Sequence, residues 1–195
     1  MIIFSKEVRA MTMENPNFID EIIEGLLGYR LGGFVYKKFV KEIEFKNNQK
    51  ILEFGCGGGC LTKHVVKKLD NKSFITSIDI SDFWVNKAKK RLKKYENINI
   101  LTGDINCLDI KEGSFDTVLI HYVLHDIHIA DRENIIKTLK DKLKINGKIY
   151  IKEPTKETHG MPVSEIRQLM TSNNLEEVRF KNDNKKFLGV YKKNL

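Results

Sequence analysis

The sequence predicts an α/β fold: a doubly wound, mostly parallel seven-stranded sheet with helices on both faces and an antiparallel C-terminal hairpin. Two observations predict this class. Short β-like runs alternate with amphipathic helical stripes between residues 50 and 172, a pattern typical of repeated βα units. The last two β-like runs are joined only by the polar link Lys181–Lys185, which suits a hairpin.

The first 48 residues are expected to form a helical cap or lid. Apolar residues recur at helical spacing in Asn17–Leu27 and again in Phe34–Ile43. Gly28 and the Gly32-Gly33 pair separate these segments and give the backbone freedom to move. No linker rich in Pro, Gly or Ser follows, so we expect one domain over residues 1–195, with an α/β core at 49–195.

Seven segments are predicted to be strands because they are short, rich in β-formers and bounded by glycine or polar residues. They are Lys50–Phe54, Phe74–Asp79, Ile98–Leu101, Phe115–His121, Lys148–Lys152, Leu175–Phe180 and Lys186–Tyr191.

Four helices are predicted between these strands, each with apolar residues three or four positions apart. Three of the stripes are Leu61, Val65, Val66 and Leu69; Trp84, Ala88, Leu92 and Tyr95; and Ile135, Ile136, Leu139 and Leu143. The fourth helix covers about Val163–Ser172. Asp131 is the predicted cap of the third helix and Asn146-Gly147 its predicted end.

Composition excludes several classes of protein. The 195 residues are 41% hydrophobic and 31% charged, and no apolar run approaches the ~18 residues of a membrane span, so we expect neither disorder nor a membrane partner. Cys56, Cys60 and Cys107 cannot build a disulfide framework, which favours a reducing cytoplasm. The net charge of +8 comes mostly from lysines spread along the predicted helices, so charge does not decide for nucleic acid.

Ligands of such sheets bind beyond the carboxyl ends of the strands, so those ends indicate function. The first strand runs into Glu53-Phe54-Gly55-Cys56-Gly57-Gly58-Gly59, where glycines let the backbone approach a ligand. A dinucleotide fingerprint would need glycine at position 60, where Cys60 stands. The second strand ends in Asp79, about 20 residues past the glycines, where a carboxylate can accept both hydroxyls of a ribose.

These strand ends resemble, in order and spacing from Ile51 to Pro154, the motifs of class I S-adenosylmethionine-dependent methyltransferases, beginning with ExGxGxG. The resemblance implies S-adenosylmethionine as cofactor and S-adenosylhomocysteine as product. It implies that Glu53 lies near the methionine amine, either directly or through the glycine turn. It also implies that Asp104 binds the adenine amino group and that Ile105 packs on the ring. His121, at the end of the fourth strand, would line the same pocket through its backbone or ring, or would simply end the strand. The implied cofactor-binding residues are Glu53, Gly55, Cys56, Gly57, Gly59, Asp79, Ile80, Asp104, Ile105 and His121.

The segment Leu124-His125-Asp126-Ile127 resembles the LHDW segment of small-molecule O-methyltransferases. In that family the histidine deprotonates a substrate hydroxyl, and a glutamate that ends the fifth strand positions it; Glu153 matches this glutamate. A neighbouring carboxylate fixes the tautomer of an imidazole and raises its basicity. No tryptophan follows Asp126, and His159 and Gly160 stand where a second glutamate would be. A packing or substrate-lining role for His125 therefore stays open.

The function expected from this resemblance is methyl transfer from S-adenosylmethionine to a small molecule by in-line displacement, with His125 as candidate base and no metal. Tyr29, Tyr36 and His159 are candidates for the lid and the substrate wall. The alternatives are an RNA or protein methyltransferase and a protein that binds the cofactor without turnover. Nucleic acid is disfavoured because Ile120-His121-Tyr122-Val123 stands where amino-methylating enzymes carry (D/N)PPY. We expect a monomer or a homodimer.

Overall fold

The computed structural model describes residues 32–156 and 160–195, in which a seven-stranded sheet has the order β3-β2-β1-β4-β5-β7-β6. The strands are β1 Lys50–Phe54, β2 Phe74–Asp79, β3 Ile98–Thr102, β4 Phe115–His121, β5 Leu143–Pro154, β6 Leu175–Asp183 and β7 Lys186–Lys193. The helices are α3 Gly32–Val40, α4 Cys60–Val66, α5 Asp82–Leu92, α6 Ile129–Lys142 and α7 Val163–Ser172, with a 3₁₀ turn, η2, at Leu124–Asp126.

Strand pairing confirms the predicted architecture. β1 pairs in parallel with both β2 and β4, and the parallel run continues to β3 on one side and β5 on the other. β7 pairs antiparallel with β5 and with β6, so the predicted C-terminal hairpin forms one edge of the sheet. The strand order reverses between β1 and β4, and in open α/β sheets the ligand crevice lies at that point.

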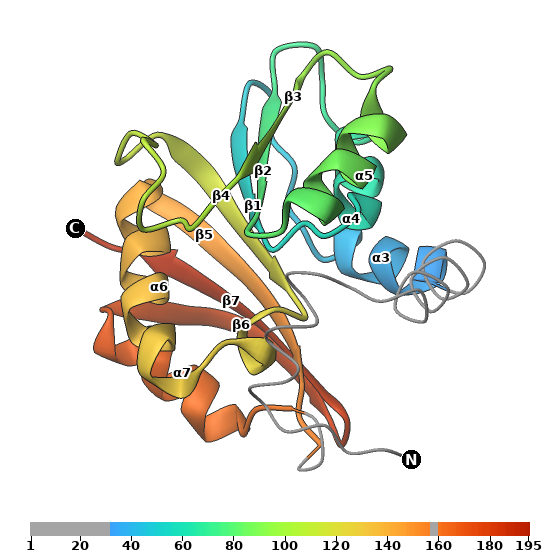
Figure 1. The fold of residues 1–195 in the computed structure, drawn as a ribbon. Coiled ribbons are helices and arrows are strands. Elements are labelled where there is room, and N and C mark those ends of the chain that lie inside the picture. The colour runs from blue at the N-terminus through green and yellow to red at the C-terminus, as the bar shows by residue number, and fades with distance from the viewer. Residues whose placement is uncertain (1–31, 157–159) are drawn as a thin grey trace, which may run out of the picture.

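Helices cover both faces of the sheet, α3, α4 and α5 on one side and α6 and α7 on the other (Figure 1). Successive side chains of each strand point to opposite faces of the sheet. Ile51 and Leu119 join the apolar cluster beneath α3 and α4, whereas Leu52 and Val118 join the cluster beneath α6 and α7. No helix in the described part of the chain has the length and apolar character that crossing a membrane requires.

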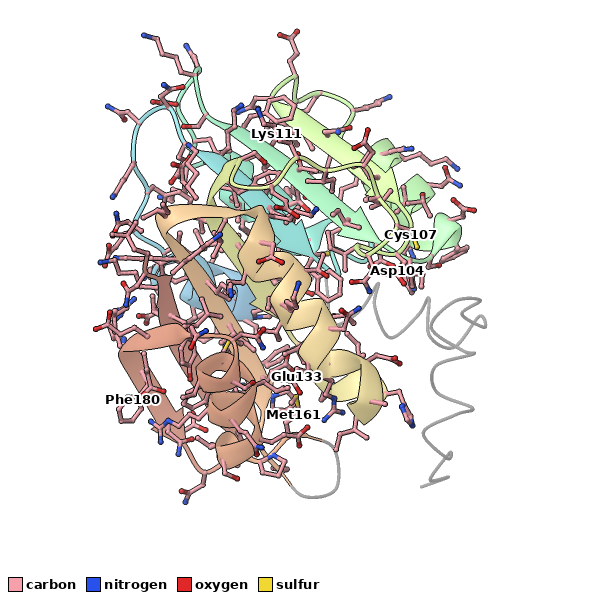
Figure 2. All side chains as sticks on the ribbon, turned by 90° about the vertical axis from the view of Figure 1, so that its left-hand side faces the viewer. Asp104, Cys107, Lys111, Glu133, Met161 and Phe180 are labelled. Atoms are coloured by element: carbon pink, nitrogen blue, oxygen red, sulfur yellow. The ribbon has the colours of Figure 1, made fainter. Side chains whose placement is uncertain are left out.

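Residues 103–114, all of which the structure describes, connect β3 to β4 as a loop without a helix. This loop runs from the carboxyl ends of the parallel strands back to their amino ends, where β4 begins. Asp104 and Lys111 accordingly lie at its two ends in Figure 2. Asp104 therefore stays at the edge where ligands of such sheets bind.

The third predicted helix ends earlier than expected. The prediction extended it through Leu143 to Asn146-Gly147, but α6 ends at Lys142 and Leu143 begins β5, opposite Phe115. Asn146 has a left-handed backbone with φ 64, and the β4–β5 register shifts between Phe115 and Thr117. Leu143 is buried, as a helical residue at that spacing would also be, so periodicity alone does not separate the two states.

Two further predictions need correction, and three more concern residues outside the described part of the chain. His128, rather than Asp131, caps α6, because its Nδ1 accepts a hydrogen bond from the Ala130 N–H at 3.4 Å. Helix α3 spans Gly32–Val40 instead of Phe34–Ile43. The predicted helix Asn17–Leu27, and with it Tyr29 and His159, lies outside the described residues.

Candidate functional site

In the loop between β1 and α4, Gly55 and Gly59 pack against neighbouring side chains, whereas Gly57 has open space beside it. A Cβ built on Gly55 would lie 2.4 Å from the Val123 side chain, and one on Gly59 would lie 2.8 Å from Leu92. A Cβ on Gly57, where φ is +49°, would meet nothing within 4 Å. Gly57 therefore exposes its backbone to empty space at the carboxyl end of β1, as a close-fitting ligand would need.

Asp79 ties the end of β2 to this loop. Its Oδ2 accepts a hydrogen bond from the Gly57 N–H at 2.7 Å, and its Oδ1 accepts one from the Ser81 N–H at 3.0 Å. The N–H groups of Gly55 and Cys56 both donate to the Ile78 carbonyl oxygen at 2.9 Å. The structure thus brings the predicted residues of the first two strand ends together. A carboxylate accepts about four hydrogen bonds, so this arrangement is compatible with a ribose diol.

The predicted adenine-side residues divide between the surface and the core. Ile80 is 57% exposed beside Asp79, and Asp104 is exposed, with Oδ1 accepting a hydrogen bond from the Asn106 N–H at 2.8 Å. Ile105 is 1% exposed within the cluster under α6 and α7. The expected packing of the Ile105 side chain on an adenine ring does not agree with this placement, and Ile80 is the exposed apolar side chain beside Asp79.

Glu53 lies inside the molecule, beneath the glycine loop. Its Oε2 accepts hydrogen bonds from Thr62 Oγ1 of α4 at 2.6 Å and from Ser77 Oγ of β2 at 2.8 Å. Burial raises the pKa of Glu53 to about 7, although both hydroxyls act to lower it. Glu53 therefore connects β1, β2 and α4 and supports the glycine loop from below. Cys56 is also buried, and burial raises the pKa of its thiol.

The structure brings His125 and Glu153 together. His125 Nδ1 lies 2.7 Å from Glu153 Oε2, and Glu153 is fully buried. The other carboxylate oxygen, Oε1, accepts hydrogen bonds from the N–H groups of Val123 and Leu124 at 2.9 Å each. Glu153 therefore holds both the imidazole and the first turn of η2. Because Val123 also packs on Gly55, the turn that carries His125 adjoins the glycine loop.

A second carboxylate faces the other nitrogen of His125. Asp126 Oδ2 lies 3.2 Å from His125 Nε2, and the His125 side chain is 6% exposed. A neutral imidazole donates from one nitrogen only, whereas a protonated ring donates to both carboxylates. For Nε2 to take a proton from another molecule, the Asp126 carboxylate has to turn away.

His121 lies on the opposite face of the sheet, beneath α3. Its ring centroid is 5.2 Å from that of Tyr36, 4.8 Å from Phe39 and 4.3 Å from Tyr122. Burial, reinforced by the charge of Lys152, lowers the pKa of His121 to about 3, so the ring is neutral. Tyr36, a predicted lid residue, is half-buried over this ring.

Sequence reasoning missed several residues around this site. Arg132 is 3% exposed; it donates to the Ile127 and His125 carbonyl oxygens and pairs with Glu165 of α7. Arg91 of α5 donates to the Gly58 carbonyl oxygen behind the loop. Lys152 is 9% exposed on β5. The signal available for Lys152 was its place directly after the apolar run Ile149-Tyr150-Ile151, because a strand with such a run is buried on both faces.

Comparison with known proteins identifies the family of this chain. The profile of a family described as a methyltransferase domain matches residues 45–194. Demethylmenaquinone methyltransferase of Staphylococcus saprophyticus is 27% identical over 122 residues, which are 63% of this chain and 52% of that protein. The ubiquinone biosynthesis O-methyltransferase of Coxiella burnetii is 26% identical over 114 residues, 58% of this chain and 47% of that protein. The chain spans about half the length of these curated relatives.

Solved structures share the fold. The N-methyltransferase NodS of Bradyrhizobium japonicum, in complex with S-adenosylhomocysteine, has a TM-score of 0.71 at 16% identity, covering 95% of this chain and 98% of that one. The [4+2]-cyclase SpnF has a TM-score of 0.79 at 11% identity, covering 97% of each chain. At these identities the likeness concerns the fold alone, and it confirms the predicted fold class.

Proposed function

Because the chain belongs to the class I S-adenosylmethionine-dependent methyltransferase family, we propose that it transfers a methyl group from S-adenosylmethionine to a small molecule. The observation that carries this proposal is the opening at Gly57 beside Asp79. A left-handed glycine with empty space around its missing side chain adjoins a carboxylate at the sheet's switch point. This site fits a nucleoside ligand whose ribose hydroxyls contact the Asp79 carboxylate and whose tail contacts the backbone of the glycine loop.

The residues proposed to hold the cofactor are those that line this edge. We assign the glycine-loop backbone at Gly55–Gly59 to the methionine part, with Glu53 supporting it from beneath. We assign Asp79 to the ribose, and Ile80 and Asp104 to the adenine side. S-adenosylmethionine supplies a methyl group already activated on a sulfonium, so the task of the protein is to hold the acceptor in line and exclude water.

We propose His125 as the general base for an acceptor hydroxyl. The proton would pass from the hydroxyl to His125 Nε2, while Nδ1–H donates to Glu153 and fixes the tautomer. This role requires Asp126 to leave Nε2 when the acceptor binds. Glu153 acts through the imidazole and is a positioning residue in this scheme.

The names of the two curated relatives support a small-molecule acceptor. One name refers to demethylmenaquinone and the other to ubiquinone biosynthesis and O-methylation. Phenols and quinols are therefore the first acceptors to test, because both present a hydroxyl that a base can deprotonate.

The test is release of S-adenosylhomocysteine from S-adenosylmethionine in the presence of a panel of phenols and quinols. We expect at least one acceptor to raise the release rate well above that of the protein with cofactor alone. Equal rates with every acceptor would contradict small-molecule methyl transfer.

A second candidate function is cofactor binding without turnover. The observation that favours it is the Asp126 carboxylate on His125 Nε2, which occupies the atom a base would use. Tight cofactor binding, together with no release of product across phenols, quinols, RNA and peptides, would support this function over the first.

A further inference from the structure

Three polar side chains meet beneath α3 at the ends of β4 and β5, on the face opposite His125. His121 and Lys152 are register partners on neighbouring parallel strands, and Tyr122 follows His121. The Lys152 side chain is 9% exposed. Within residues 32–156 and 160–195 it has neither a hydrogen bond nor an ion pair, and its Nζ lies 5.5 Å from the centre of the Tyr122 ring.

Two more polar atoms of this cluster are buried, and no described residue forms a hydrogen bond with them. They are Nε2 of His121 and the hydroxyl oxygen of Tyr122. A buried polar group without a partner costs about 1–3 kcal/mol, so native proteins rarely keep one without a reason. Two such atoms next to an unpaired lysine indicate that something else supplies their partners.

The backbone conformation of Tyr122 also indicates a ligand site at this cluster. Tyr122 has φ 61, the left-handed region that a bulky residue seldom adopts, and its N–H donates to the Lys152 carbonyl oxygen at 2.8 Å. In this conformation the Tyr122 ring lies close to both the His121 ring and Lys152 Nζ. Strained residues of this kind cluster at ligand and active sites.

The charges that face Lys152 leave its ammonium without a carboxylate of its own. Besides burial, the positive charges of Lys186 of β7 and Lys38 of α3 lower its pKa, and the negative charges of Asp183 of β6 and Glu42 after α3 raise it. Glu42 already pairs with Arg179 and Lys181, and Asp183 accepts the N–H groups of Lys185 and Lys186. Burial and the two lysines lower the pKa of Lys152 to about 8, which still leaves it mostly protonated at neutral pH.

We propose that Lys152, His121 and Tyr122 form a subsite for a carboxylate carried by the acceptor molecule. The ammonium, the Tyr122 hydroxyl and the His121 Nε2–H tautomer would each donate to the carboxylate oxygens. The aromatic rings of Tyr36 and Phe39 lie against His121 and suit an apolar or aromatic body. That the bound carboxylate belongs to the methyl acceptor rests on the proposed function, whereas the carboxylate subsite itself rests on these three side chains alone. The acceptor is therefore an aromatic or apolar carboxylic acid, and its entry requires the half-buried Tyr36 to move aside.

The experiment compares benzoate with benzamide, which has the same shape and no charge, and needs no cofactor. Each is titrated into the full chain carrying ¹³C-labelled histidine, and the ring signals are followed by NMR; the His121 signal is assigned by its loss in H121N. We expect benzoate to shift the His121 signal saturably and to bind at least tenfold more tightly than benzamide. Equal binding of the two probes, or no shift of the His121 signal, would overturn the proposal.

Two variants make the test specific to Lys152. K152M should remove the preference for benzoate, and K148M should keep it. Lys148 lies on the same face of β5, and its partner is the exposed Glu44. Replacing an unpaired buried ammonium by an apolar chain should leave the melting temperature of K152M at or above that of the wild type. Retention of the benzoate preference in a folded K152M would contradict the proposal.

The proposed function is tested separately by titrating S-adenosylmethionine into the same proteins. A benzoate preference in a chain that does not bind S-adenosylmethionine would keep the subsite and refute the methyl-transfer proposal. Binding of S-adenosylmethionine without a preference for benzoate would refute the subsite and leave the methyl-transfer proposal standing.

Discussion

Glu53 shows how a residue of the ligand loop can act from inside the core. The motif resemblance left open whether it contacts the methionine amine directly or acts through the glycine turn. In the structure its carboxyl group accepts hydrogen bonds from two hydroxyls under the loop. Whether the side chain at a strand end points to solvent or into the adjoining layer depends on partners such as Thr62, nine positions away. The sequence pattern of the strand does not contain that information.

The raised pKa of Glu53 makes the stability of the protein depend on pH. Below the ordinary value of 4.5 the carboxyl is neutral in both folded and unfolded chains, and this contribution to stability is complete. It is lost as pH rises through about 7, because the unfolded chain ionises first. The loss of stability reaches about 3–4 kcal/mol, at ~1.4 kcal/mol per pH unit between 4.5 and about 7. Urea titrations between pH 5 and pH 8 should show a smaller loss for E53Q, and parallel curves for the two proteins would contradict this account.

Gly57 offers a matched test of the ligand loop. Gly57 and Gly113 both have a left-handed backbone with nothing within 4 Å of a built Cβ, but only Gly57 adjoins Asp79. G57L should lower the affinity for S-adenosylhomocysteine at least tenfold, about 1.4 kcal/mol, because the side chain fills the ligand's space. G113L carries the same backbone strain and should bind as the wild type does. Calorimetric titration of the two variants decides the point, and equal losses would mean that strain alone is responsible.

His125 is testable against a neighbouring histidine. If His125 is the base, H125A should lose about a hundredfold or more in turnover while cofactor affinity stays unchanged. H128A is the control, because His128 is exposed and its ring caps α6. Initial rates and cofactor titration measure the two quantities. Near-normal turnover of H125A would assign the residue to packing.

At the scale of elements, boundaries were predictable where turn chemistry marks them. β1, β2, β4 and α7 have the predicted bounds because glycine, proline or polar residues flank them. The junction of α6 and β5 was not predictable, since Leu143 keeps helical spacing while pairing with β4 decides its state. The buried cluster of Lys152 and Tyr122 was also not predictable, because it depends on which face α3 covers.

Arg132 links η2, α6 and α7. It is 3% exposed, and its guanidinium reaches two carbonyl oxygens of the turn and Glu165. R132A should lower the free energy of unfolding by about 3 kcal/mol or more, because buried partners lose their hydrogen bonds. K137A breaks an ion pair on the same helix whose lysine is 65% exposed, and should cost less than about 0.5 kcal/mol. Urea unfolding measures both, and equal effects would refute the role of Arg132.

At the scale of the whole molecule, the order of the strands explains why the candidate residues gather. β1 lies between β2 and β4 and is parallel to both, so the glycine loop, Asp79 and the turn after β4 all lie at the carboxyl ends of these strands. This convergence followed from the alternation of strands and helices in the sequence. The division of that edge into a His125 side under α6 and α7 and a His121 side under α3 did not, because it requires knowing which face each helix covers.

The central claim is that the glycine loop and Asp79 hold S-adenosylmethionine, and calorimetric titration of the full chain tests it most directly. S-adenosylmethionine and S-adenosylhomocysteine should each bind at one site with micromolar affinity, and NADH should give no heat of binding. Binding of NADH in place of both sulfur nucleosides, or binding of none of the three, would contradict the account.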